Sequence, residues 1–153
     1  MNMQELSTVT SERIVEAMRS HNLAFAMTPK GDFFIPYAAH TVFISNIGSA
    51  TMPTWICEAQ WSRRVDIAYM AKVKNYIQQQ SATAVAPKMT FRVNDDGRIA
   101  FRASWVFNWR DKATDEQIKG ELAVLLIGTE RVFSELAQEF PDPWAAAPKE
   151  ADQ

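Results

Sequence analysis

The sequence contains one cysteine and only two histidines among its 153 residues. A single cysteine, Cys57, excludes an internal disulfide and is typical of a protein from a reducing compartment. Together with His21 and His40 it lacks the spacing of a zinc site, so we expect no metal. Neither histidine lies in a motif that would activate a serine or cysteine nucleophile, so no catalytic residue and no enzymatic activity are expected.

Glycine and net charge are also scarce. None of the five glycines forms the strand–glycine loop–helix that binds nucleotide phosphates, so we expect no cofactor. The net charge of -2 gives no overall attraction to nucleic acid or to an anionic membrane. The most apolar run, LAVLLI, is too short to span a bilayer, and MNMQELSTVT lacks a signal-peptide pattern. A cytoplasmic protein with no membrane contact is the expectation.

The stretch KMTFRVNDDGRIAFRASWVF predicts a β-hairpin. A two-residue loop at Asp96-Gly97 would place Phe91 opposite Arg102, an unfavourable apolar–charged pair. We favour a three-residue loop with Gly97 in the left-handed region, where glycine has no Cβ to clash. This register sets three apolar pairs opposite one another: Val93 and Ile99, Phe91 and Phe101, Met89 and Ala103.

Three helices are predicted around this hairpin. The first spans about residues 11–21 with Thr10 as its N-cap, and the second begins near Asp66. The apolar stripe of the second helix consists of Val65, Tyr69, Met70, Val73, Tyr76 and Ile77. The third begins with the capping box Thr114 and Gln117 and ends at Pro141; its Gly120 and Gly128 suggest a close approach to the sheet.

Four short apolar segments between the first two helices read as strands: LAFAM, DFFIPY, TVFISNI and TWICEAQW. The order is therefore helix, antiparallel strands, helix, β-hairpin and long C-terminal helix. This segregation predicts an α+β fold with the helices mainly on one face of the sheet. We expect an N-terminal arm over residues 1–9, one domain over 10–144 and a disordered tail over 145–153.

The chain resembles the YbjN family of bacterial proteins over roughly residues 10–144. The resemblance depends on EAQWSRRV, on APKMTFRVNDDGRIAFRA and on TDEQIKGELAVLLIGTERVFSELAQEFPDPW. The chain departs from the family at Asn75-Tyr76-Ile77, where many members carry an Asn-x-Trp-Asn motif, and at Lys112-Ala113, where a glycine is common. The resemblance implies a type III secretion chaperone-like sandwich, usually dimeric, that holds partner polypeptides and is linked to stress or sensory regulation.

The polar face of the hairpin carries Arg92, Arg98 and Arg102, and Arg63-Arg64 precede the predicted second helix. This face is a candidate anion-binding surface, a solvated face that keeps an exposed strand soluble, or a protein-interaction surface. Nucleic-acid binding would need Trp105 or Trp109 for base stacking, but Trp105 falls on the buried side of the predicted register.

Candidate partner-binding residues come from the second helix and from the connecting segments: Tyr69, Val73, Tyr76, Trp109 and Trp144. We expect a homodimer that uses the second helix or a sheet edge. The leading hypothesis is a non-enzymatic protein- or peptide-binding module. The alternatives are a regulatory protein with a small-ligand pocket between helix and sheet, and nucleic-acid binding through Arg92, Arg98 and Arg102.

Overall fold

The computed structural model describes residues 5–83, 87–110 and 112–141. Within these ranges the chain forms α1 (Ser11–Ser20), β1 (Ala26–Met27), β2 (Phe33–Pro36), β3 (His40–Asn46), β4 (Trp55–Asp66), the 3-10 helix η1 (Ile67–Tyr69), α2 (Met70–Thr83), β5 (Lys88–Val93), β6 (Arg98–Val106) and α3 (Asp115–Glu139). The predicted tail over 145–153 and the first four residues of the predicted arm lie outside the described residues.

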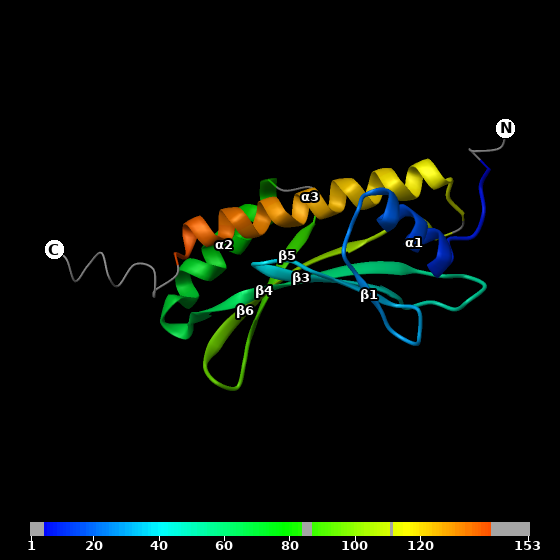
Figure 1. Cartoon of the computed structure of the whole chain (residues 1–153). Helices are drawn as coiled ribbons and strands as arrows, with labels where there is room; N and C mark the ends of the chain where they lie inside the picture. Colours follow the sequence, from blue (N-terminus) through cyan, green and yellow to red (C-terminus); the bar gives the residue numbers. More distant parts are fainter. Residues whose placement is uncertain (1–4, 84–86, 111, 142–153) are drawn as a thin grey trace.

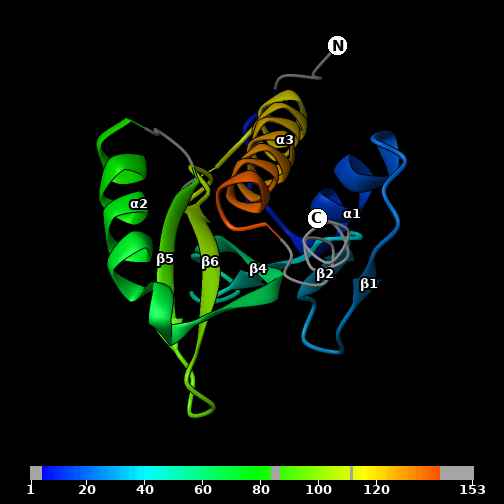
Figure 2. The same ribbon diagram turned by 90° about the vertical axis from the view of Figure 1, so that its left-hand side faces the viewer.

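One antiparallel sheet contains all of these strands in the order β1-β2-β3-β4-β6-β5. Helices α1 and α3 lie over one face of the sheet, and α2 lies beside the edge strand β5 (Figures 1 and 2). The α+β prediction is therefore confirmed. None of the helices in the described ranges is long and apolar enough to cross a membrane.

The hairpin β5–β6 has the predicted register. Val93 pairs with Ile99, Phe91 with Phe101 and Met89 with Ala103. The backbone of Gly97 has a φ of 75°, in the left-handed region, and the Asn94 N–H donates to the Arg98 carbonyl at 2.8 Å to close the loop. Alternation along both strands therefore sends the apolar side chains toward the helices and the arginines away from them.

The predicted helix starts are also present. The Thr10 side chain accepts a hydrogen bond from the Arg13 N–H, and Thr114 and Gln117 form both bonds of the capping box. The Gln117 N–H donates to Thr114 Oγ1 at 3.1 Å, and the Thr114 N–H donates to Gln117 Oε1 at 2.8 Å. These bonds satisfy backbone donors that the first helical turn leaves without a partner.

The strand β4 is longer than the sequence predicted. It continues past Trp61 to Asp66, with a register shift between Gln60 and Arg64. Val65, which the sequence pattern assigns to the second helix, therefore lies in β4 opposite Ile99. Asp66 does act as an N-cap, since its carboxylate accepts from the Ala68 N–H at 2.8 Å, but it caps η1 and the α-helix begins at Met70.

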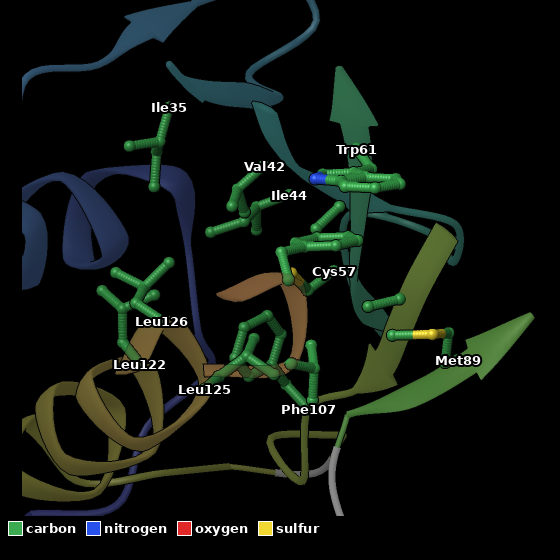
Figure 3. Packing of buried hydrophobic residues seen from close by; sticks show 14 of the residues in the cluster. Ile35, Val42, Ile44, Cys57, Trp61, Met89, Phe107, Leu122, Leu125 and Leu126 are labelled. Atoms are coloured by element: carbon green, nitrogen blue, oxygen red, sulfur yellow. The ribbon is translucent and has the colours of Figure 1, made fainter. Parts of the chain in front are cut away.

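The core lies between the helices and the inner face of the sheet. Leu122, Leu125 and Leu126 of α3 meet side chains from β2, β3 and β4 in one cluster (Figure 3). Full burial of a large aliphatic or aromatic side chain contributes about 1.5–3 kcal/mol, so this cluster is the main source of stability. Gly120 is not part of this packing: it is exposed, and nothing lies within 4 Å of the position of a Cβ. The predicted close approach to the sheet at Gly120 is wrong.

Candidate functional site: an arginine cluster on the open face of the sheet

The face of the sheet that the helices leave uncovered carries a concentration of arginines. Ala100 of β6 pairs with Arg64 of β4, and Arg92 of β5 pairs with Ala100 from the other side. Arg98 and Arg102 stand two residues before and after Ala100 on β6. Directly paired residues share a face, and so do residues two apart along a strand. The four arginine side chains therefore surround Ala100, and we call them the arginine cluster.

Only one member of the arginine cluster has an acidic partner in the described part of the chain. Arg102 Nη1 lies 3.8 Å from Glu58 Oε2, across β4 and β6. Among the described residues no carboxylate oxygen lies within 4.0 Å of Arg64, Arg92 or Arg98. Like charges that crowd one sheet face repel each other and destabilise the fold. An anionic ligand would relieve this repulsion.

A pocket of about 270 Å³ adjoins the arginine cluster and shares Arg64 with it. It lies where the end of β4, η1, the start of α2 and the end of α3 meet, and we call it the end pocket. Its apolar and aromatic lining consists of Trp61, Val65, Tyr69, Phe140 and Pro141, and its charged lining consists of Arg63, Arg64, Asp66, Lys72 and Glu139.

Two cations of the end pocket rest on its aromatic walls. The Arg63 guanidinium carbon lies 4.5 Å from the centre of the Trp61 ring, and Lys72 Nζ lies 5.0 Å from the centre of the Phe140 ring. Lys72 Nζ also donates to the Glu139 carbonyl at 2.9 Å, which ties α2 to the end of α3. These contacts hold the cations at the pocket wall.

Both carboxylates of the end pocket are engaged within the protein. Asp66 caps η1 through the Ala68 N–H, and Glu139 Oε1 lies 3.9 Å from Lys72 Nζ. Arg64 has neither a hydrogen bond nor an ion pair from its side chain to any residue that the structure describes. The positive charge of Arg64 is therefore available to a ligand that reaches either the pocket or the open face.

The predicted arginines and the structure agree, with one addition. Arg92, Arg98 and Arg102 share the open face, as expected from the hairpin register. The sequence pattern ends the strand at Trp61 and places Arg64 before a helix, so it misses the membership of Arg64 in the cluster; the register shift leaves Gln60 and Arg64 on the same face of the sheet. The available signal was that the apolar residues at alternate positions, Trp55, Cys57, Ala59 and Trp61, are followed in the same alternation by Val65, which leaves Arg64 on the opposite face.

The predicted partner-binding residues are mostly unavailable. Val73, Tyr76 and Trp109 are buried in the core of the chain itself. The Tyr76 ring packs edge-on against Phe140 at 5.9 Å, and Trp109 stacks on Phe107 at 4.0 Å. Tyr69 is 54% exposed and remains available, whereas Trp144 lies outside the described residues. Of the candidates that the structure describes, only Tyr69 can touch a partner without a rearrangement.

The histidine and the cysteine with shifted pKa values are both core residues. Burial lowers the pKa of His40, although the Glu130 carboxylate opposes this effect. Burial raises the pKa of Cys57 to about 12, so its side chain is a protonated thiol at neutral pH. Across the described ranges, no group of three or more His, Cys, Asp or Glu side chains is arranged to hold a metal ion.

Comparison with known proteins adds no assignment: no protein-family model matches the chain, and no curated protein or solved structure matches it either. The arginine cluster and the end pocket are thus the features from which a function has to be argued.

Proposed function

We propose that this chain is a non-enzymatic binding module that takes an acidic peptide segment of a partner protein onto the arginine cluster. The observation that carries the proposal is that Arg64, Arg92 and Arg98 have no carboxylate partner in the described residues. The chain as a whole has 18 acidic and 16 basic side chains, so an unpaired group of cations is a local feature. A ligand with several carboxylates would supply the missing negative charge.

The spacing of the cluster suits an extended acidic peptide. Neighbouring strands lie about 4.8 Å apart, and alternate residues of one strand lie about 6.7 Å apart. Alternate side chains of an extended peptide have the same repeat, so its carboxylates can reach successive guanidinium groups. Arginine forms two parallel hydrogen bonds with a carboxylate, which gives such contacts direction as well as charge attraction.

Nucleic acid fits this face less well. The proposed stacking residue Trp105 lies on the helix side of the sheet, where its indole N–H donates to Glu121 Oε1 at 3.1 Å. Trp109, the other candidate, is buried. Sequence-independent binding of a single strand needs aromatic platforms beside the basic groove. The carboxylates of Glu58 and Asp66 also border the cluster, opposite Ser104 and Arg98, which keeps the basic area short.

Fluorescence anisotropy with a labelled ten-residue peptide of glutamate and serine tests the proposal. The peptide is expected to bind the protein and to lose affinity as salt is raised, because exposed charges are screened beyond about 8 Å at 0.15 M salt. The double variant Arg64→Gln with Arg92→Gln is expected to weaken binding about tenfold, because it removes two exposed ion pairs of up to about 1 kcal/mol each and a loss of about 1.4 kcal/mol is tenfold in affinity.

Arg19→Gln with Arg131→Gln provides the matched control, because both arginines are exposed on helices of the covered face and the charge changes equally. A single-stranded oligonucleotide is titrated in parallel. The proposal fails if the acidic peptide does not bind at low salt, if both double variants weaken it equally, or if the oligonucleotide binds more tightly.

The homodimer implied by the family resemblance is a separate part of the proposal. Of the residues predicted to form the dimer contact, Tyr69 is exposed, whereas Val73 and Tyr76 are buried. The sheet edges that could form the contact instead are β1 and β5. Sedimentation equilibrium at tens of micromolar protein distinguishes a monomer from a homodimer, and a single monomeric species would count against the homodimer.

A further inference from the structure

We infer that the end pocket binds one large apolar side chain, aromatic or long aliphatic, that lies next to the acidic residues of the same partner segment. The inference rests on the proposed function, and it adds the specificity that charge alone cannot provide. Its starting point is that Arg64 belongs both to the arginine cluster and to the lining of the end pocket. A segment whose carboxylate contacts Arg64 can therefore extend a neighbouring side chain toward the pocket.

The end pocket is large enough to hold one large side chain of a ligand. Pockets for drug-sized ligands and cofactors have volumes of about 300–1,000 Å³. The end pocket, at about 270 Å³, lies just below this range. It is therefore suited to one anchoring group of a longer ligand, in the way that a few buried aromatic residues anchor most protein interfaces.

The walls of the end pocket favour an apolar group with a planar or extended shape. Trp61, Val65 and Phe140 are buried and form its inner lining. The rings of Trp61 and Phe140 both pack against the ring of Phe101 in β6, with 5.8 Å between ring centres in each case. These contacts support the two walls from the core. Side chains that are fixed in this way lose little freedom when a ligand binds.

The charges around the end pocket explain why the apolar group needs an acidic neighbour. Three cations and two carboxylates line the pocket, and both carboxylates have partners within the protein. Arg63 and Lys72 lie against the aromatic walls, while Arg64 has no partner in the described residues. A basic residue beside the anchor would add to this positive charge, and an acidic residue would offset it.

Tyr69 is an exposed part of the lining of the end pocket, which allows a test that leaves the core intact. Tyr69 and Ile67 belong to the same short helix and are about equally exposed, but only Tyr69 lines the pocket. Replacing Tyr69 removes one wall of the pocket. The variant Ile67→Ala removes a similar exposed side chain without touching the pocket, and is the matched control.

Three labelled ten-residue peptides separate the two contributions. The first has one phenylalanine flanked by four glutamates, the second replaces the phenylalanine with serine, and the third keeps the phenylalanine and replaces the glutamates with glutamine. The first peptide is expected to bind about tenfold more tightly than the second, as the burial of much of one phenylalanine ring predicts. Tyr69→Ala is expected to reduce this ratio at least threefold, and Ile67→Ala to leave it unchanged.

The outcomes distinguish a failure of the proposed function from a failure of the inference about the end pocket. Equal binding of the first two peptides overturns the pocket inference and leaves the proposed function standing. If Tyr69→Ala and Ile67→Ala reduce the affinity ratio of the first peptide to the second equally, the inference is also overturned, since the phenylalanine then binds elsewhere. If neither acidic peptide binds, the proposed function fails and the inference fails with it. If the glutamine peptide binds as well as the first, the pocket takes an apolar group without help from the arginine cluster. That result overturns the proposed binding of acidic residues to the arginine cluster. It also overturns the inference that the apolar group needs an acidic neighbour.

Discussion

His40 of β3 lies directly opposite Trp61 of β4, and neither His40 Nε2 nor Trp61 Nε1 has a hydrogen-bond partner among the described residues. Both nitrogen atoms are buried, and a buried polar group without a partner costs about 1–3 kcal/mol. The His40 ring instead stacks on Tyr37 at 4.7 Å and contacts the Phe133 ring at 5.0 Å. His40 therefore packs as an aromatic group, and its surroundings favour the uncharged form.

This environment predicts that His40 makes the stability of the protein depend on pH. In the unfolded chain a histidine has a pKa of 6.5, and burial lowers the pKa of His40 in the folded chain. Between these two pKa values the unfolded state binds more protons, so stability rises with pH. The contribution is fully present above 6.5 and is lost as the pH falls through the lower, folded-state pKa.

Urea unfolding of the wild type and of His40→Phe at several pH values from 7.5 to 5.0 measures this contribution. The variant keeps a ring between Tyr37 and Phe133 but cannot bind a proton. The difference in unfolding free energy between the two proteins should shift in favour of the variant as the pH falls. A difference that stays constant over this range would show that the proton on His40 is not responsible.

Cys57 is predicted to be unreactive in the folded protein. Its side chain is buried on the inner face of β4, and burial raises its pKa to about 12. Only the thiolate is nucleophilic, and at pH 8 roughly one thiol in ten thousand would be ionised. Iodoacetamide should therefore label Cys57 in 6 M urea and not in buffer, as mass spectrometry would detect. Rapid labelling in buffer, while circular dichroism shows a folded protein, would contradict the buried position.

The parts of the structure that the sequence predicted are those set by residues close together in the chain. The loop with Gly97 and the capping box of Thr114 and Gln117 depend on residues three or four positions apart, so their patterns identify them directly. The extra residues in β4 between Gln60 and Arg64 are different. A bulge of this kind is stabilised by the neighbouring strand, and no local preference in the segment WSRRVD indicates it.

The candidate site illustrates the same limit. The face of Arg92, Arg98 and Arg102 follows from alternation within one hairpin, and the sequence predicted it. The addition of Arg64 requires the pairing of β4 with β6, two strands that are separated along the chain by η1, α2 and β5. The apolar partner-binding candidates that are buried in the structure show a different limit. An apolar side chain suits a core and an interface equally well, so the type of residue at Val73, Tyr76 and Trp109 cannot distinguish the two.

Arg13 is predicted to contribute more to stability than any exposed arginine. Its guanidinium group donates to the carbonyl oxygens of Ser7 at 2.7 Å, Thr8 at 3.1 Å and Ala113 at 2.9 Å, and to Asp115 Oδ1 at 2.7 Å. It therefore joins the N-terminal segment, α1 and the start of α3. Hydrogen bonds that involve a charged group contribute about 1.5–3 kcal/mol, so Arg13→Met should lower the free energy of unfolding by about 2–3 kcal/mol.

Arg19→Met is the matched control for this prediction. Arg19 lies on the same helix, its side chain is 69% exposed, and its ion pair with Glu16 has an N–O distance of 3.7 Å. Exposed pairs of this kind contribute about 0–1 kcal/mol. Chemical unfolding of both variants compares the two arginines, and equal effects would mean that the bonds of Arg13 add nothing to those of an ordinary surface residue.

Two glycine-to-alanine substitutions are predicted to have opposite effects on stability. Gly120 is an exposed position inside α3 with nothing within 4 Å of the place a methyl group would take, so Gly120→Ala should stabilise the protein by about 1 kcal/mol through helix propensity. Gly97 also has open space around it, but its φ of 75° is strained for any residue with a Cβ. Gly97→Ala should therefore destabilise the protein by about 1–2 kcal/mol. Thermal unfolding should show a higher melting temperature for the first variant and a lower one for the second. Because both sites have room for a methyl group, a change of the same sign at both would mean that backbone conformation is not what distinguishes them.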